Sequence, residues 1–268
     1  MLNKTPDLLK HEAILRILEQ EYAWDGGDIF IHSSLASTNE FLLKTLPVNA
    51  NPQLCLAEHQ TAGRGRRGRQ WASPFAENIY LSIGYRSYVD KERLGLLSLA
   101  VGIAVAGMLN EMIDGSVSVK WPNDIYCNQQ KLAGILIEVK EFKPEYVDLI
   151  IGVGLNVNMT RGEVIDQPWT SLNKLGKTIP DRSTLAARMA GNIVNELDSL
   201  TSASNADFLK KWQSYDYLFN KPVQTQGAEE IAGIANGINE RGELLVKTPE
   251  KLHTVHSGEV SVRLKRDL

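Results

Sequence analysis

Six short apolar runs lie between Asp28 and Val157, and several follow one another with no helical stretch between them. Their β-branched and aromatic residues predict strands at 28–32, 53–58, 78–84, 117–121, 133–139 and 147–157. Apolar residues at helical spacing predict helices at 38–46, 92–113, 182–200 and 206–216. Strands that are joined without a crossover helix run antiparallel, so we expect a mixed sheet and an α/β or α+β fold.

The longest apolar stretch, residues 94–110, has the composition of a membrane span but not its length. It contains no charged residue, yet it is at the short limit for a bilayer and holds three glycines, a serine and a terminal asparagine. Arg93 and Glu111 flank it closely. A helix that is apolar on all sides is more often the buried centre of a soluble domain, so we predict a core helix and no membrane association.

The two ends of the chain have patterns of apolar residues and turn signals that differ from those of the middle. Residues 5–22 have the leucine and isoleucine spacing of one helix, with Pro6 and Asp7 suited to its first turn. After Tyr217, short apolar runs alternate with turn signals at 236–237, 241–242 and 257–258, a pattern typical of a small antiparallel β-barrel. We therefore predict three parts: a helical leader at 1–27, a catalytic domain at 28–219 and a barrel at 220–268.

The overall charge and the cysteines exclude several classes of protein. A formal net charge of −3 and a pI near 6.0 argue against a general binder of nucleic acid or membrane surfaces. Cys55 and Cys127 lie in apolar segments without metal-ligand spacing, which predicts buried free thiols in a reducing compartment. No secretory leader opens the chain, so we expect a cytoplasmic protein.

Positive charge is concentrated in one segment, residues 63–69, which we call the Gly-Arg loop; it holds four arginines and three glycines. Glycines let backbone approach a ligand, and arginines offer planar charged forks to carboxylate or phosphate. The glycines also fit a dinucleotide-binding pattern, but Pro74 prevents the helix that this motif requires. An RNA-type Arg/Gly segment and a merely solvated loop remain as alternatives to an anion site.

Two further segments carry polar groups beside predicted elements. Ser37-Thr38-Asn39-Glu40 precedes an apolar helix, where it predicts a capping box, a site for a small polar ligand group, or both. Lys120-Trp121-Pro122-Asn123-Asp124 ends a strand, and 126–130 is predicted to form a hairpin tip before Lys131. Asp124 is either a turn residue or a ligand that holds Mg²⁺ together with a substrate phosphate. Lys131 either extends into solvent or belongs to a binding site.

A pair of glycines, Gly152 and Gly154, interrupts the last apolar strand. Glycine inside a strand indicates that something bulky approaches the backbone closely. Asn156 follows in the same strand and needs a hydrogen-bond partner if it is buried.

The segments STNE, GRGRRGRQW, KWPND and KLAGILIE, in this order, resemble the biotin protein ligases, and Asn220-Lys221-Pro222-Val223 resembles that family's SH3-like domain. The resemblance implies a class II synthetase-like catalytic domain. It places these residues at biotin: Ser37, Thr38, Asn39, Gln60, Gly63, Arg64, Arg66, Lys131 and Gly134. It places these at ATP or the adenylate: Arg66, Arg69, Trp71, Asn123, Asp124, Lys131, Asn156, Trp169 and Arg182. Arg66 and Lys131 are the expected catalytic residues, and Asp124 is the expected Mg²⁺ ligand.

The implied activity is ATP- and Mg²⁺-dependent formation of biotinyl-5′-AMP, followed by transfer of biotin to a lysine of a carboxylase carrier domain. The short leader implies neither repressor function nor DNA binding, and a homodimer is possible. The Gly-Arg loop is expected to lack order when empty and to close as a lid over bound anion. The alternatives are a lipoate or octanoate ligase of similar fold, and a non-catalytic module that binds biotin or nucleic acid.

Overall fold

The computed structural model describes residues 6–25, 27–45, 47–113, 116–162, 165, 167–176, 180–226, 230–258 and 261–264. Its larger sheet has the order β1-β2-β3-β7-β6-β5-β4, in which β1 runs parallel to β2 and every other neighbouring pair is antiparallel. The strands are β1 (Ile29–His32), β2 (Gln53–Ala57), β3 (Ile79–Ser87), β4 (Val117–Lys120), β5 (Asp124–Cys127), β6 (Gln130–Phe142) and β7 (Val147–Leu155). The mixed sheet of the α/β prediction is confirmed.

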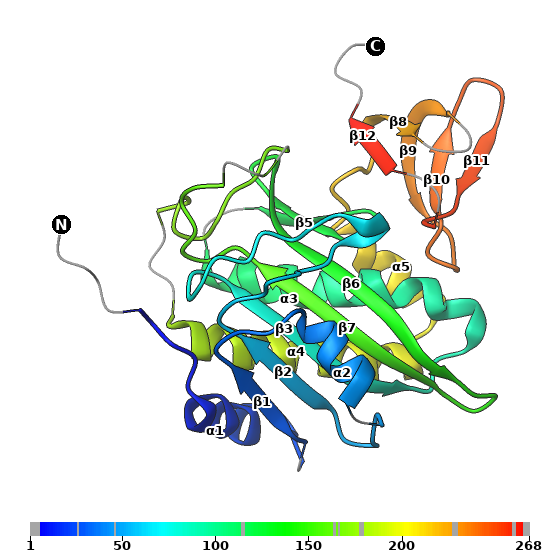
Figure 1. Ribbon diagram of the computed structural model, residues 1–268. Helices are drawn as coiled ribbons and strands as arrows, with labels where there is room; N and C mark the ends of the chain where they lie inside the picture. The colour runs from blue at the N-terminus through cyan, green and yellow to red at the C-terminus, as the bar shows by residue number, and fades with distance from the viewer. Residues whose placement is uncertain are drawn as a thin grey trace.

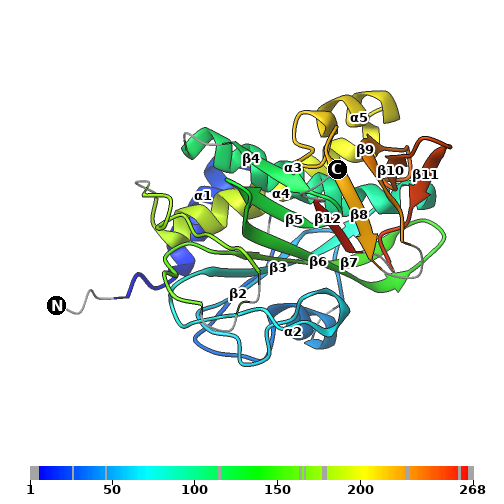
Figure 2. The same cartoon turned by 90° about the horizontal axis from the view of Figure 1, so that it is seen from above.

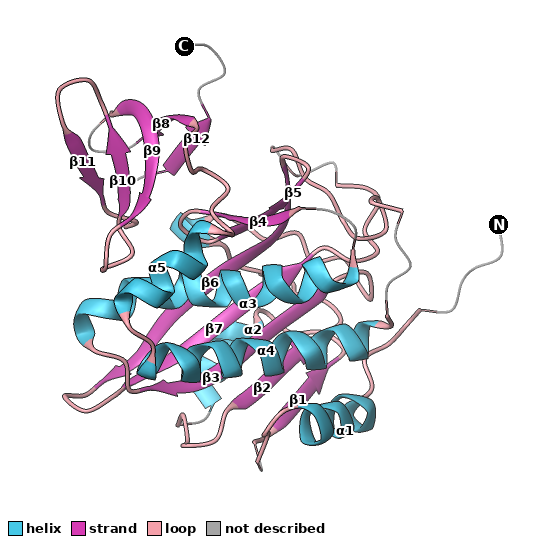
Figure 3. Cartoon of the chain, turned by 180° about the vertical axis from the view of Figure 1, so that it is seen from behind, coloured by secondary structure: helices cyan, strands magenta, loops and turns pink. Residues whose placement is uncertain are grey.

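Helices cover the two faces of this sheet unequally. Figures 1 and 3 show α1 (His11–Glu21), α3 (Leu97–Met112), α4 (Arg182–Ser202) and α5 (Asn205–Gln213) on one side. Among the described residues, the other side carries one helix, α2 (Thr38–Thr45), together with loops, as the view from above also shows (Figure 2). The second face therefore has less helical cover than the first.

The uncharged segment forms the core helix that its composition predicts. The helix Lys91–Met112, in which a 3-10 turn η2 (Lys91–Leu96) leads into α3, is long and apolar enough to cross a membrane. However, 67% of its most apolar window is buried inside the protein. A Cβ at Gly102 would lie 2.7 Å from Val119 Cγ1, so the helix backbone packs directly on β4. The helix is the centre of the layer that supports the sheet.

The last part of the chain forms a second, five-stranded antiparallel sheet of order β11-β10-β9-β8-β12. Its strands are β8 (Pro222–Gln226), β9 (Ala232–Ile238), β10 (Leu244–Lys247), β11 (Leu252–Val255) and β12 (Ser261–Leu264). The turn predicted at Asn236-Gly237 is wrong, because both residues lie within β9. The Asn-Gly signal marks a bulge instead, since Gly237 has φ +81° where the register with β10 shifts.

The leader is bound to the larger sheet by polar contacts. Its helix α1 begins at His11, later than predicted, and Lys10 before it has an extended backbone. Leu9 donates its backbone N–H to Glu58 Oε1 at 2.6 Å, and Asp7 Oδ2 accepts from the backbone N–H of Arg182 at 2.9 Å. The division of the chain into three parts at 27 and 219 stays a prediction.

Candidate active site

A cavity of about 680 Å³ lies on the α2 side of the larger sheet and extends to the second sheet. Among its described lining residues there is one acidic side chain, Asp124. Eight are basic: Arg64, Arg66, Arg67, Arg69, Lys120, Lys131, Lys221 and Arg263. This imbalance in a concave site attracts anions, although the whole chain carries net negative charge.

The Gly-Arg loop folds back on itself at the edge of this cavity. Gly65 donates its N–H to Arg69 O at 2.7 Å, and Trp71 donates its N–H to Gly63 O at 2.9 Å. A single 3-10 turn, η1 (Arg66–Gly68), closes the loop, and Arg67 takes φ 59°. No long helix follows, in keeping with the exclusion of a dinucleotide-binding motif. The expected loss of order in the empty loop stays a prediction.

Two arginines of the loop reach across to other elements. Arg64 Nη2 lies 2.8 Å from Glu138 Oε2 on β6. Arg66 donates to Asn123 Oδ1 at 3.0 Å and also to the backbone carbonyl of Ser257, in the turn after β11 of the second sheet. Burial lowers the pKa of Arg66, and the Asp124 carboxylate opposes that shift. A bound anion would offset the same desolvation.

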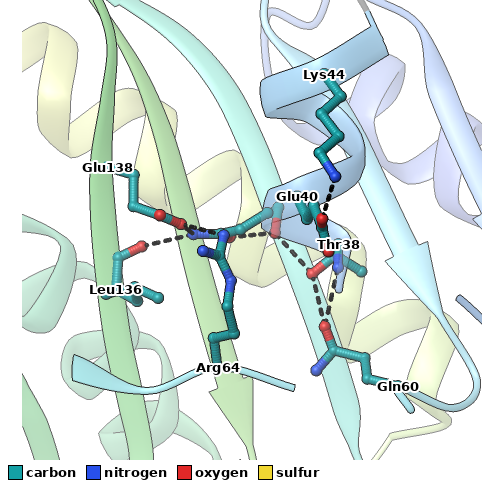
Figure 4. Close-up of polar contacts among 9 residues, drawn as sticks. Thr38, Glu40, Lys44, Gln60, Arg64, Leu136 and Glu138 are labelled. Atoms are coloured by element: carbon teal, nitrogen blue, oxygen red, sulfur yellow. Dashed lines mark hydrogen bonds and ion pairs between the residues drawn. The ribbon is translucent and has the colours of Figure 1, made fainter. Parts of the chain in front are cut away.

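The first turn of α2 forms a polar end of the cavity. Gln60 Oε1 accepts from Thr38 N at 2.9 Å and from Thr38 Oγ1 at 3.2 Å, while Gln60 Nε2 donates to Ser73 Oγ at 3.1 Å. Ser37 lines the cavity beside them. The predicted capping box is wrong for Glu40, which pairs with Lys44 in the next turn instead (Figure 4). Gln60 satisfies the helix N-terminus in its place.

Three glycines make the floor of the cavity. A Cβ at Gly154 would lie 2.4 Å from the Trp71 ring, and one at Gly134 would lie 2.9 Å from it. A Cβ at Gly152 would lie 2.2 Å from Asn39 Oδ1. The bulky groups that the strand glycines accommodate are therefore side chains of the protein itself. The Trp71 Nε1–H is buried against Gly154 and has no hydrogen-bond partner in the structure.

Lys131 stands on the cationic wall at the start of β6. Its Nζ lies 2.7 Å from Asp124 Oδ1 on β5 and 5.4 Å from the centroid of the Trp71 ring. Hydrogen bonds with Pro168 and Thr170 hold its backbone, so the amine projects from a fixed strand end. The hairpin tip is shorter than predicted, because β5 continues to Cys127.

The second sheet and β4 contribute cations that the sequence interpretation left out. Lys221 Nζ lies 3.9 Å over the Tyr217 ring, and Arg263 lines the cavity from β12. Lys120 Nζ lies 3.5 Å from the Tyr126 hydroxyl, and burial lowers its pKa. Lys120 and Lys221 belong to motifs quoted above, KWPND and NKPV, so their signal was present in the sequence. Arg263 had no such signal.

The structure brings most predicted site residues together but leaves four outside the cavity lining. Arg182 is 1% exposed, and its guanidinium is enclosed by Glu58 at 2.6 Å and by the carbonyls of Asp7 and Asn78. Asn156 Nδ2 donates to Thr170 O at 3.0 Å, which supplies the partner that its burial requires. The Trp169 ring lies under Lys174 Nζ at 4.0 Å, and Gly63 packs against Ser73 and Trp71.

The carboxylate content of the cavity suits a metal held mainly by a substrate. Among the described residues, no group of three His, Cys, Asp or Glu side chains gathers as a metal site. Of the lining residues that the structure describes, Asp124 is the one that carries a carboxylate. Mg²⁺ commonly binds one or two carboxylates together with substrate phosphates, so Asp124 fits such an ion only with a phosphorylated ligand present.

Residues 32–156 match the model of the Biotin/lipoate A/B protein ligase family, and residues 218–263 match that of the Biotin protein ligase C terminal domain. The chain is 38% identical over 242 residues to the bifunctional ligase/repressor BirA of Escherichia coli (strain K12), covering 89% of this chain and 75% of that protein. It is 34% identical to the biotin--[acetyl-CoA-carboxylase] ligase of Mycobacterium tuberculosis, and the match covers 84% of this chain and 85% of that protein. It also resembles the biotin protein ligase of Aquifex aeolicus in complex with biotin and ATP: TM-score 0.77, 29% identity, 89% of this chain and 99% of that chain.

Proposed function

The chain belongs to the biotin/lipoate A/B protein ligase family and is an ATP-dependent biotin protein ligase, and we propose that the cavity described above carries out both steps of its reaction. In the first step a biotin carboxylate oxygen attacks the α-phosphorus of ATP, and pyrophosphate leaves. In the second step a carrier lysine amine attacks the carbonyl carbon of biotinyl-5′-AMP, and AMP leaves. The observation that carries this assignment is a cavity whose described lining holds eight basic residues together with the hydrogen-bonding start of α2.

The first step joins one anion to a polyanion, so its barrier is largely electrostatic. Arg66 and Lys131 are the charges best placed to lower it, because both line the cavity on either side of Asn123 and Asp124. Mg²⁺ held by Asp124 and the phosphates would supply further neutralisation. Fixed cations are sufficient for this chemistry, and no covalent enzyme intermediate is required.

The polar end of the cavity is where we place the biotin ring. Thr38 and Gln60 present a hydroxyl and an amide, and the ureido group of biotin carries both donors and acceptors for them. The apolar parts of the biotin ring would pack against the Trp71 ring, which itself covers Gly134 and Gly154. Of the residues expected at biotin, Gly63 supports Trp71 from behind and does not line the cavity.

The same polar end disfavours a lipoate ligase. A dithiolane ring has no donors or acceptors to match the hydroxyls and the amide at this end of the cavity, whereas the ureido ring of biotin carries both. We therefore propose biotin over lipoate as the acyl substrate.

The Gly-Arg loop serves the second step by retaining the adenylate until the carrier arrives. It closes over the cavity through Arg64 and Arg66, which contact β6 and the second sheet. Closure excludes water from the mixed anhydride and keeps its negative charge among arginines.

A direct assay tests the function. The protein is incubated with ATP, Mg²⁺ and a biotin carboxyl carrier domain, with either biotin or lipoate supplied. We expect the mass of the carrier to rise by one biotinyl group, and a carrier whose target lysine is replaced by arginine to stay unmodified. Transfer of lipoate, or of neither acid, would reject the assignment. The absence of DNA binding and repressor function, the homodimer and the cytoplasmic location stay predictions.

A further inference from the structure

Glu138 on β6 lies outside the cavity lining and has no part in the steps described so far. Its Oε2 accepts hydrogen bonds from two residues that do line the cavity, Arg64 Nη2 at 2.8 Å and Asn39 Nδ2 at 2.8 Å. Arg64 belongs to the Gly-Arg loop, and Asn39 belongs to the first turn of α2. One carboxylate oxygen therefore joins the loop to the polar end of the cavity (Figure 4).

The amide of Asn39 is fully engaged by the protein. Its Nδ2 donates to Glu138 and to Leu136 O at 3.2 Å, and its Oδ1 lies 2.5 Å from Ser82 Oγ. The side chain is 4% exposed and packs where a Cβ of Gly152 would stand. Asn39 therefore acts as a rigid connection whose orientation depends on Glu138, and its amide is not free to bind biotin.

Hydrogen bonds continue from Asn39 to the proposed biotin ring site. Ser82 Oγ lies 2.7 Å from Thr38 Oγ1, and Thr38 donates to Gln60 Oε1. A continuous chain of polar contacts thus runs from Arg64 in the loop, through Glu138 and Asn39, to Thr38 and Gln60. Any displacement of Glu138 changes both ends of this chain.

The strength of the Arg64–Glu138 pair suits a contact that has to open. The two side chains are 41% and 25% exposed, so water screens their attraction and can replace it. A fully buried ion pair would be costly to separate. The Glu138 carboxylate also offsets the mutual repulsion of the clustered loop arginines, which otherwise favours an extended loop.

We propose that Glu138 is a positioning residue that latches the Gly-Arg loop closed by holding Arg64, and that it ties closure to the biotin ring site through Asn39. The identity of the ligand rests on the proposed function, but the latch itself does not. Glu138→Gln is the discriminating change, since it keeps the side-chain shape and an oxygen for Asn39 but removes the charge that holds Arg64.

Limited trypsin digestion tests the latch and is run both on the empty protein, where the loop is expected to be less ordered, and on the protein with biotin bound. Cleavage after Arg66 and Arg67 should be about two- to fivefold faster in Glu138→Gln than in wild type, because a partly exposed ion pair shifts the loop population by about that factor. Glu141→Gln is the matched control: it lies on the same strand, and its 2.6 Å pair with Lys143 is in solvent. The control should match wild type, and circular dichroism should show all variants folded. Equal cleavage of Glu138→Gln and wild type in both conditions overturns the latch.

A second variant reaches the same contact from the loop side. Arg64→Gln should raise cleavage after Arg66 and Arg67 by a similar factor, and the double variant should be cleaved no faster than the faster single variant. Rates that multiply in the double variant would mean that the two residues act separately, which also rejects the proposal.

Retention of the adenylate connects the latch to catalysis. After a single turnover with biotin and ATP, bound biotinyl-AMP should leave Glu138→Gln about two- to fivefold faster than wild type. Unchanged release, with adenylate formed normally, contradicts the latch and leaves the proposed function intact. If wild type forms no adenylate, the proposed function fails, and the trypsin rates still decide the latch.

Discussion

Lys131 Nζ and Asp124 Oδ1 lie 2.7 Å apart on neighbouring strands, with both side chains largely shielded from water at the wall of the cavity. An incoming carboxylate or phosphate competes with Asp124 for the same ammonium group. We expect Lys131→Gln to lower the rate of biotinyl-AMP formation by on the order of 10²–10³, since one electrostatic contact to developing charge is worth about that much. Pyrophosphate release measures this rate. Lys143→Gln removes a similar but exposed pair and should leave the rate unchanged.

Gly154 is expected to tolerate no side chain, because a Cβ there would lie 2.4 Å from the Trp71 ring. In Gly154→Ala the indole has to move from the floor of the cavity. We expect the KM for biotin to rise by on the order of tenfold to a hundredfold, as a displacement of about 1 Å in a binding site does. Gly258→Ala is the control, since a Cβ there meets open space. An unchanged KM in Gly154→Ala would show that Trp71 does not contact biotin.

Burial of the Lys120 amine makes the stability of the fold depend on pH. Burial lowers its pKa from the ordinary value of 10.5, so the unfolded chain holds the proton more tightly than the folded protein does. Burying the charged Lys120 amine therefore destabilises the folded protein fully at pH values below the lowered pKa, and this destabilisation fades as the pH rises toward 10.5. We expect Lys120→Met to raise Tm at neutral pH, with the gain shrinking in alkaline buffer. Thermal unfolding across pH measures this, and a gain that grows with pH would contradict the sign.

The same Lys120→Met variant should bind ATP less well. Loss of a charged contact to phosphate is worth about tenfold to a hundredfold in affinity. The KM for ATP measures the effect, and the KM for biotin serves as the internal control. Equal changes in both constants would mean that Lys120 acts on the fold of the cavity and not on the nucleotide.

We expect Arg182 to stabilise the fold through its buried ion pair. Its guanidinium is buried with Glu58 at 2.6 Å, so Arg182→Met leaves a buried carboxylate without its partner. We expect the free energy of unfolding to fall by about 3–5 kcal/mol, measured by urea denaturation. Arg188→Met on the same helix breaks an exposed pair with Glu21 and should cost at most about 1 kcal/mol. Similar losses in both variants would argue against the buried pair.

Arg66 should control leakage of the intermediate. Arg66→Gly removes the contacts with Asn123 and Ser257 and one cation of the cavity. We expect free biotinyl-AMP to appear in solution during single-turnover reactions without a carrier, and non-specific biotinylation of added protein to increase. An intermediate that stays bound in Arg66→Gly would exclude Arg66 as the residue that retains it.

The sequence was most informative where a local pattern determines the structure. Runs of β-branched residues placed most strands of the larger sheet, and the composition of 94–110 identified its core helix. The strand β5 was missed because Asp-Ile-Tyr-Cys is short and begins with a residue that favours turns. Asn236-Gly237 was read as a turn because the same φ > 0 preference serves a bulge.

The site was predictable as a set of motifs but not as an assembly. The Gly-Arg loop, Lys131 and Thr38 carry local signals, and the structure brings them around one cavity. Arg182 was expected at the nucleotide because of the family resemblance, and a local pattern does not show that its partner Glu58 lies 124 positions away in the chain. Arg263 was missed for the same reason, since its role depends on how the second sheet docks.

Part of the cavity wall is supplied by the last segment of the chain, which follows the other site residues in the sequence. The carbonyl of Ser257 that holds Arg66, and the cations of Lys221 and Arg263, all come from the second sheet. A nascent chain that has already exposed the Gly-Arg loop and Lys131 still lacks this wall. These segments therefore complete a wall of the cavity that the Gly-Arg loop and Lys131 do not form by themselves. A fragment that stops before residue 257 would lack the Ser257 carbonyl and Arg263, and of the described hydrogen bonds of Arg66 it would keep the one with Asn123.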